Sequence, residues 1–117
     1  MTIESNESCD VLVVGTGAGG LAAALSAAAE GLSVLVVEKT DRVGGSTAIS
    51  GGAIWAPNNA QSSRVGHPDS PARARAYMRA VVADATPQHL QDAFLDAAPA
   101  MVDWFERHTE LRLAGRT

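Results

Sequence analysis

Residues 11–21 read Val-Leu-Val-Val-Gly-Thr-Gly-Ala-Gly-Gly-Leu, an apolar run followed by closely spaced glycines. The β-branched run predicts a buried strand, and Gly15, Gly17 and Gly20 have the spacing G-x-G-x-x-G. In a dinucleotide fold the first glycine allows a sharp turn, the second allows close approach to a pyrophosphate, and the third lets a helix pack on the strand. The Ala- and Leu-rich run 19–30 predicts that helix, whose N-terminus favours phosphate.

A second strand is predicted over residues 33–37, and Glu38 follows it directly. Strand, glycine motif, helix, strand and acid in this order are typical of a Rossmann-like βαβ unit, an α/β fold with parallel strands. A carboxylate at this place accepts the hydroxyls of an adenosine ribose and repels a 2′-phosphate. The sequence therefore predicts dinucleotide binding and disfavours NADP.

Two further glycine pairs, Gly44-Gly45 and Gly51-Gly52, enclose a run of small residues after the predicted acid. A flexible linker would be polar throughout, whereas Ile49, Ile54 and Trp55 are interleaved here. Glycine and small hydroxyl side chains let the backbone approach a large planar ring system and bind its edge. An NAD-binding unit has no need for this second segment, so we predict FAD as the cofactor.

The composition limits the function classes. With 117 residues, of which 46% are hydrophobic, the chain forms one domain at most. A net charge of −4 leaves no basic surface for nucleic acid. The single cysteine, Cys9, favours the reducing cytoplasm. His67, His89 and His108 have no partner spaced as a metal ligand or a catalytic pair, so we predict neither a metal site nor a catalytic residue.

Residues 1–8 are polar and acidic, unlike a signal peptide, and we expect a disordered leader there. The apolar span 11–37 is broken by glycines and polar residues, so no transmembrane segment is expected. The sequence also predicts a surface loop over 58–69, a helix from Pro71 to about Asp84, and a helix after Pro87 that breaks at Pro99. A short strand is predicted over 111–113.

The chain resembles the N-terminal FAD-binding segment of the fumarate reductase/succinate dehydrogenase flavoprotein superfamily, which has a GR2-type FAD fold. The resemblance rests on Glu38, on the turn 44–47 and on the run Ser-Gly-Gly-Ala-Ile-Trp-Ala-Pro-Asn-Asn over 50–59. Within the superfamily the pattern G-G-S-T-A-x-S-G-G-x-I-W-x-P-x-N is most similar to 3-ketosteroid Δ1-dehydrogenases. The runs 69–80 and 98–106 fit the same group, so the resemblance covers nearly the whole chain.

The resemblance implies a set of cofactor-binding residues on the two glycine-rich turns and at the end of the second strand. Along the pyrophosphate it places Gly15, Gly17, Ala18, Gly19 and Gly20. At the adenosine ribose it places Glu38, with Lys39 beside it. Around the flavin it places Gly45, Ser46, Thr47, Ser50, Gly51 and Gly52.

The resemblance also implies a reaction in which a base removes a proton next to a ketone and the neighbouring C–H leaves as hydride to the flavin. Members of the family are several times longer, and their substrate domain and catalytic tyrosines follow this segment. We therefore expect residues 9–117 to be the N-terminal part of an incomplete FAD-binding domain that is inactive alone. Three alternatives stay open: part of a flavin-dependent 3-ketosteroid dehydrogenase, part of a fumarate-reductase-like enzyme, or a non-catalytic FAD-binding remnant.

Overall fold

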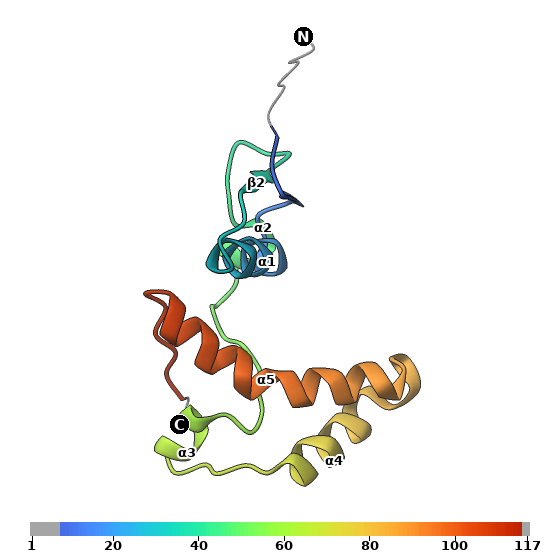
Figure 1. The fold of residues 1–117 in the computed structure, drawn as a ribbon. Coiled ribbons are helices and arrows are strands. Elements are labelled where there is room, and N and C mark those ends of the chain that lie inside the picture. The colour runs from blue at the N-terminus through green and yellow to red at the C-terminus, as the bar shows by residue number, and fades with distance from the viewer. Residues whose placement is uncertain (1–7, 116–117) are drawn as a thin grey trace. The chain divides into compact units, whose positions relative to one another are not determined.

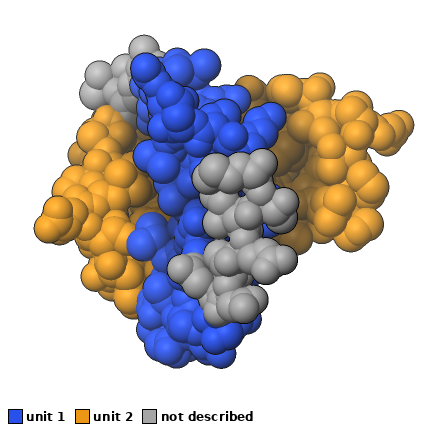
Figure 2. Space-filling model, turned by 90° about the horizontal axis from the view of Figure 1, so that it is seen from above, with its two compact units in different colours: residues 1–53 blue, residues 54–117 orange. Residues whose placement is uncertain are grey.

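A computed structural model describes residues 8–115 and divides the chain into two compact units, Met1–Ala53 and Ile54–Thr117. Figure 2 shows the two units in different colours. The leader predicted over residues 1–8 lies outside the described residues except for Ser8, which is exposed. Within the described part of the chain, no helix combines the length and the apolar character needed to cross a membrane.

The first unit is a βαβ crossover, as the glycine motif predicts. Strand β1 (Val11–Val14) leads into helix α1 (Ala18–Ala29), and strand β2 (Val34–Val37) returns parallel to β1. The helix contacts both strands and runs beside β2 in Figure 1. A four-residue helix, α2 (Gly45–Ala48), follows. The predicted Rossmann-like α/β fold is therefore confirmed in this unit.

The two strands start together because Asp10 and Ser33 are hydrogen-bonded just before them. The Ser33 hydroxyl and backbone N–H donate to the Asp10 carboxylate at 2.6 and 2.8 Å. These bonds hold the pKa of Asp10 below its usual value. They precede the first ladder pair, Val11 opposite Val34, and so help to set the register.

Only one face of this sheet is covered within the unit. Val13 lies under α1 and is 7% exposed, whereas Leu12 and Val14 point to the opposite face and are 57% and 80% exposed. Parallel sheets in α/β proteins are normally covered on both faces. The open face is therefore an apolar surface that the described residues of this unit do not cover.

The second unit is helical: α3 (Ala60–Arg64), α4 (Pro71–Val82), a 3₁₀ turn (Ala83–Ala85) and α5 (Gln88–His108). The prediction of a loop throughout 58–69 was wrong, since the Asn59 side chain accepts from the N–H of Ser62 and caps α3. The predicted strand over 111–113 was also wrong. Leu113 donates its N–H to the Glu106 carboxylate instead of to a neighbouring strand.

Helices α4 and α5 pack through a small apolar cluster of Ala74, Met78 and Leu95. Ser70 is the N-cap of α4, because its hydroxyl accepts from the N–H of Arg73. On the surface, Arg75 of α4 joins two carboxylates of α5. Its guanidinium lies 3.3 Å from Asp92 and 2.5 Å from Asp96.

The helix predicted to break at Pro99 is continuous, so that prediction was wrong. Proline inside a helix removes one backbone hydrogen bond and bends the axis without always ending the helix. Figure 1 shows α5 changing direction part-way along its length. Leu95 packs with α4 before the proline, while Ala98 and Val102 form a second cluster with Ala56 around and after it. Apolar contacts on both sides of Pro99 therefore hold the two halves in one helix.

Replacing Pro99 with alanine should stabilise the second unit by about 1 kcal/mol, because it restores the hydrogen bond to the Leu95 carbonyl. Pro71→Ala is the matched control. Pro71 occupies the first turn of α4, where proline fits, so its loss should give no stabilisation. Thermal and urea unfolding of the purified protein measure both effects. A Pro99→Ala variant less stable than the parent would show that packing depends on the bend.

Candidate cofactor-binding site

The first glycine turn has the geometry that its spacing predicts. Gly15 adopts a φ of +96°, which favours glycine, and its N–H donates to the Val37 carbonyl at 2.7 Å. A Cβ on Gly20 would lie 2.1 Å from the Gly15 carbonyl oxygen and 3.4 Å from Val13. The predicted turn at Gly15 and the close helix–strand packing at Gly20 are therefore confirmed.

Gly17 occupies a different environment. It is the N-cap of α1, has a φ of −66° and lacks a side-chain cap. A Cβ there would meet no protein atom within 4 Å. The open space therefore lies at the N-terminus of a 12-residue helix, where backbone N–H groups and the helix dipole favour an anion.

The second glycine turn lies against the first. Gly44 and Gly45 have φ values of +109° and +52°, and a Cβ on Gly45 would lie 3.4 Å from the Cα of Gly17. The Thr47 hydroxyl accepts from the Ala18 N–H at 3.1 Å. The structure thus brings together two predicted groups of site residues that are 29 positions apart in the chain.

Glu38 lies at the end of β2 and is held at both carboxylate oxygens. The Thr16 N–H and hydroxyl donate to Oε2 at 3.0 and 2.6 Å, and the Thr40 N–H donates to Oε1 at 3.1 Å. These bonds, that from the Thr16 hydroxyl above all, lower the pKa of Glu38 to about 2. The group is therefore an anion at every physiological pH.

Thr16 is the site residue that sequence reasoning missed. It is buried, at 5% exposure, and its hydroxyl also accepts from the Gly44 N–H at 2.8 Å. One side chain therefore connects the first glycine turn, Glu38 and the second glycine turn. A hydroxyl residue between the first two glycines was the available signal.

Several of the other predicted site residues are exposed to solvent. These are Gly19, Lys39, Ser46, Gly51 and Gly52. The Ser50 hydroxyl donates to the Thr47 carbonyl at 2.8 Å and accepts from the Gly52 N–H at 3.1 Å. This bonding shapes the run after α2 but does not connect it to Glu38.

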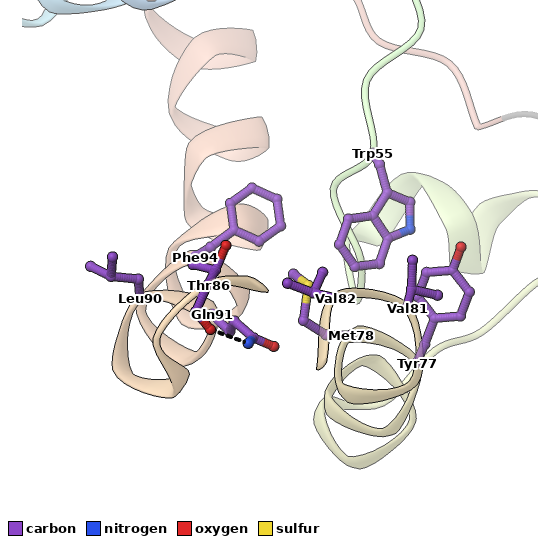
Figure 3. A pocket seen from close by; sticks show the side chains of 9 residues that line it. All are labelled: Trp55, Tyr77, Met78, Val81, Val82, Thr86, Leu90, Gln91 and Phe94. Carbon is purple, nitrogen blue, oxygen red and sulfur yellow. Dashed lines mark hydrogen bonds between the residues drawn. The ribbon is translucent and has the colours of Figure 1, made fainter. Parts of the chain in front are cut away.

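The second unit holds a hollow of about 500 Å³ between α4 and α5 (Figure 3). Its walls are mainly apolar, and Trp55 stacks on Phe94 with ring centroids 5.7 Å apart. No carboxylate, histidine or lysine lines it, and Tyr77 is the one ionisable side chain among its lining residues. The lining residues are Trp55, Tyr77, Met78, Val81, Val82, Thr86, Leu90, Gln91 and Phe94.

No group of three or more His, Cys, Asp or Glu residues among positions 8–115 is arranged to hold a metal ion. The ring of His108 stacks on Trp104, with the ring centroids 4.5 Å apart. The candidate site is therefore the pair of glycine turns with Glu38.

The model of the family described as FAD binding domain matches residues 10–117. The chain belongs to this family. FAD is accordingly its cofactor, as the second glycine segment predicted.

Relatives similar over most of the chain are oxidoreductases. The 3-oxosteroid 1-dehydrogenase of Mycolicibacterium smegmatis is 46% identical over 93% of this chain and 19% of its own length. The 4-oxocyclohex-2-ene-1-carboxylate 5-dehydrogenase of Sinomonas cyclohexanicum is 43% identical over 94% of this chain and 19% of its own length. The chain thus spans about a fifth of the length of these relatives.

A solved structure supports the same relationship. The 3-ketosteroid Δ1-dehydrogenase of Sterolibacterium denitrificans, solved in complex with 1,4-androstadiene-3,17-dione, is 44% identical with a TM-score of 0.77. The match covers 85% of this chain and 17% of that one. The chain therefore has the fold of the corresponding FAD-binding segment.

The residues of the first unit fit FAD. The open space at Gly17 lies at a helix N-terminus and suits a pyrophosphate, and the anionic Glu38 suits a ribose hydroxyl. Close contact between the two glycine turns leaves small side chains, such as Thr47, beside the space at Gly17. An isoalloxazine ring bound by such a segment accepts hydride from substrate.

Proposed function

We propose that the protein is an FAD-dependent dehydrogenase that introduces a 1,2 double bond into 3-ketosteroids. The observation that carries the proposal is the 46% identity to a 3-oxosteroid 1-dehydrogenase over 93% of the chain. The run from Trp55 to Asn58, which resembles that of steroid dehydrogenases, supports the same substrate class. The related 4-oxocyclohex-2-ene-1-carboxylate 5-dehydrogenase, by its name, also acts on a ring ketone.

In this proposal the residues of the chain hold the cofactor and do not carry out the proton transfer. The set proposed to contact FAD is the one expected from the sequence: Gly15, Gly17, Ala18, Gly19, Gly20, Glu38, Lys39, Gly45, Ser46, Thr47, Ser50, Gly51 and Gly52. Glu38 is already fixed by Thr16 and Thr40, so it does not act as the base. We propose that the base and the substrate-binding residues belong to a substrate domain outside these 117 residues.

The proposal includes a cytoplasmic enzyme that does not bind nucleic acid. The only cysteine, Cys9, is free, which suits a reducing compartment. The net charge of −4 disfavours binding to phosphate backbones.

The protein, expressed from its complete gene, should purify yellow and desaturate androstenedione with an artificial electron acceptor. The assay runs in parallel with 4-oxocyclohexanecarboxylate and with fumarate plus a reduced dye. Absorbance of the dye and mass spectrometry of the steroid product measure turnover. If only 4-oxocyclohexanecarboxylate is turned over, the proposed substrate class changes from 3-ketosteroids to small ring ketones. Reduction of fumarate alone would move the protein to the fumarate-reductase-like alternative.

The same assay applied to residues 1–117 alone should show no turnover, because the proposal assigns the base to a substrate domain outside these residues. Steroid oxidation by this isolated segment would contradict the assignment of the base to another domain.

A further inference from the structure

We propose that Thr16 is a positioning residue that fixes Glu38 so that only Oε1 accepts a hydroxyl of the adenosine ribose. The inference rests on the FAD site proposed above and goes beyond it by assigning a role to Thr16. It also changes the expectation that Glu38 binds both ribose hydroxyls.

A carboxylate oxygen has room for about two hydrogen bonds. Oε2 of Glu38 receives both from Thr16, one from the N–H at 3.0 Å and one from the hydroxyl at 2.6 Å. This oxygen is therefore filled by protein donors. A ribose hydroxyl cannot bind it without displacing Thr16.

Oε1 of Glu38 receives the Thr40 N–H at 3.1 Å. The Thr40 hydroxyl lies 3.2 Å from Oε1 but only 2.7 Å from the Arg42 carbonyl oxygen. A hydroxyl has one hydrogen, and the shorter contact takes it. Oε1 therefore keeps one acceptor position that the protein donors do not fill.

The Thr16 hydroxyl can hold Glu38 because it is itself held. It is buried, and it accepts from the Gly44 N–H at 2.8 Å while donating to Glu38. The donor direction is thereby fixed, since the Gly44 N–H can only donate. A hydroxyl bonded on both sides keeps the carboxylate in one orientation.

Charged neighbours do not explain the state of Glu38. Lys39, Asp41 and Arg42 follow it in the chain, and none forms an ion pair with it in the part of the chain that the structure describes. The first turn of α1 carries no acidic residue. Hydrogen bonds are therefore the main cause of the lowered pKa of Glu38, and the bond from the Thr16 hydroxyl contributes most.

The test compares Thr16→Val, which removes the hydroxyl at nearly constant shape, with Thr16→Ser, which keeps it. Both are made in the complete protein, with and without Glu38→Gln. The readouts are the FAD dissociation constant of the apoprotein and the ¹³C-detected pKa of the Glu38 carboxyl. The Glu38 signal is identified as the one that disappears in Glu38→Gln.

Thr16→Val should weaken FAD binding about tenfold and raise the pKa of Glu38 toward 4.5. In the Glu38→Gln background the same change should cost much less affinity, because the two effects are coupled. Thr16→Ser should keep both the affinity and the low pKa. If Thr16→Val does not fold, Thr16→Ser still tests the proposal. A tenfold loss of FAD affinity in Thr16→Ser would contradict it, because serine keeps the hydroxyl.

Two outcomes separate the inference from the proposed function. If Glu38→Gln leaves FAD affinity unchanged, the ribose contact itself is wrong. If Glu38→Gln weakens FAD but Thr16→Val leaves the pKa of Glu38 at about 2, Thr16 has no positioning role. FAD analogues lacking the adenosine 2′- or 3′-hydroxyl test the single contact: one analogue should bind like FAD and the other more weakly.

Discussion

Alanine at position 20 should prevent the first unit from folding. The added Cβ would lie 2.1 Å from the Gly15 carbonyl oxygen, which belongs to backbone and cannot move aside as a side chain can. To remove this overlap, α1 must move away from β1, which opens the packing over Val13. We expect a loss of more than about 3 kcal/mol, the cost of a severe core overlap.

Gly19→Ala is the matched control, since it lies in the same helix and its Cβ would meet no atom within 4 Å. Alanine is the better helix former there, so stability should stay equal or rise. Circular dichroism melting of the purified apoproteins measures both variants. A Gly20→Ala protein that melts like the parent would show that α1 can shift without cost.

Valine at position 17 should leave the apoprotein folded and abolish FAD retention. Gly17 has a φ of −66°, open to any residue, and its Cβ would project into empty space. The substitution should therefore lower FAD affinity and not the stability of the apoprotein, because the branched side chain occupies space assigned to the pyrophosphate. We expect affinity to fall at least about 100-fold, equivalent to about 2.8 kcal/mol.

Flavin absorbance after gel filtration and titration of apoprotein with FAD measure this effect. Gly17→Ala should give an intermediate affinity, and both variants should melt at the parent's temperature without cofactor. Flavin retained at the parental level by Gly17→Val would remove Gly17 from the site. A lower melting temperature of the apoprotein would make the effect one of folding instead.

Most of the first unit could be predicted from sequence because local patterns determine it. The apolar runs and the glycine spacing predicted the strands and the helix to within two residues. The contact between the glycine turns was implied by function but not by local pattern. It depends on Thr47 bonding to Ala18, a tertiary contact.

The second unit shows where local patterns are insufficient. Pro99 is a helix-breaking signal, yet contacts made by Leu95 and Val102 on either side of it outweigh that signal. The residues 111–113 alternate like a strand but have no neighbouring strand in the described structure. The role of Thr16 also depends on tertiary contacts, since its hydroxyl bonds to Glu38 and Gly44, which are 22 and 28 positions away.

The hydroxyl of Thr16 links the first and second glycine turns, and hydrogen exchange can be measured for an amide in each turn. The N–H groups of Thr16 and Gly44 donate to partners that exist only when the crossover has closed. In native-state hydrogen exchange, both amides should therefore exchange slowly and with the same opening free energy, although they lie outside regular strands and helices. In Thr16→Val the Gly44 amide loses its acceptor and should exchange faster than in the parent. Clearly different opening free energies for the two amides in the parent would show that the two loops open independently.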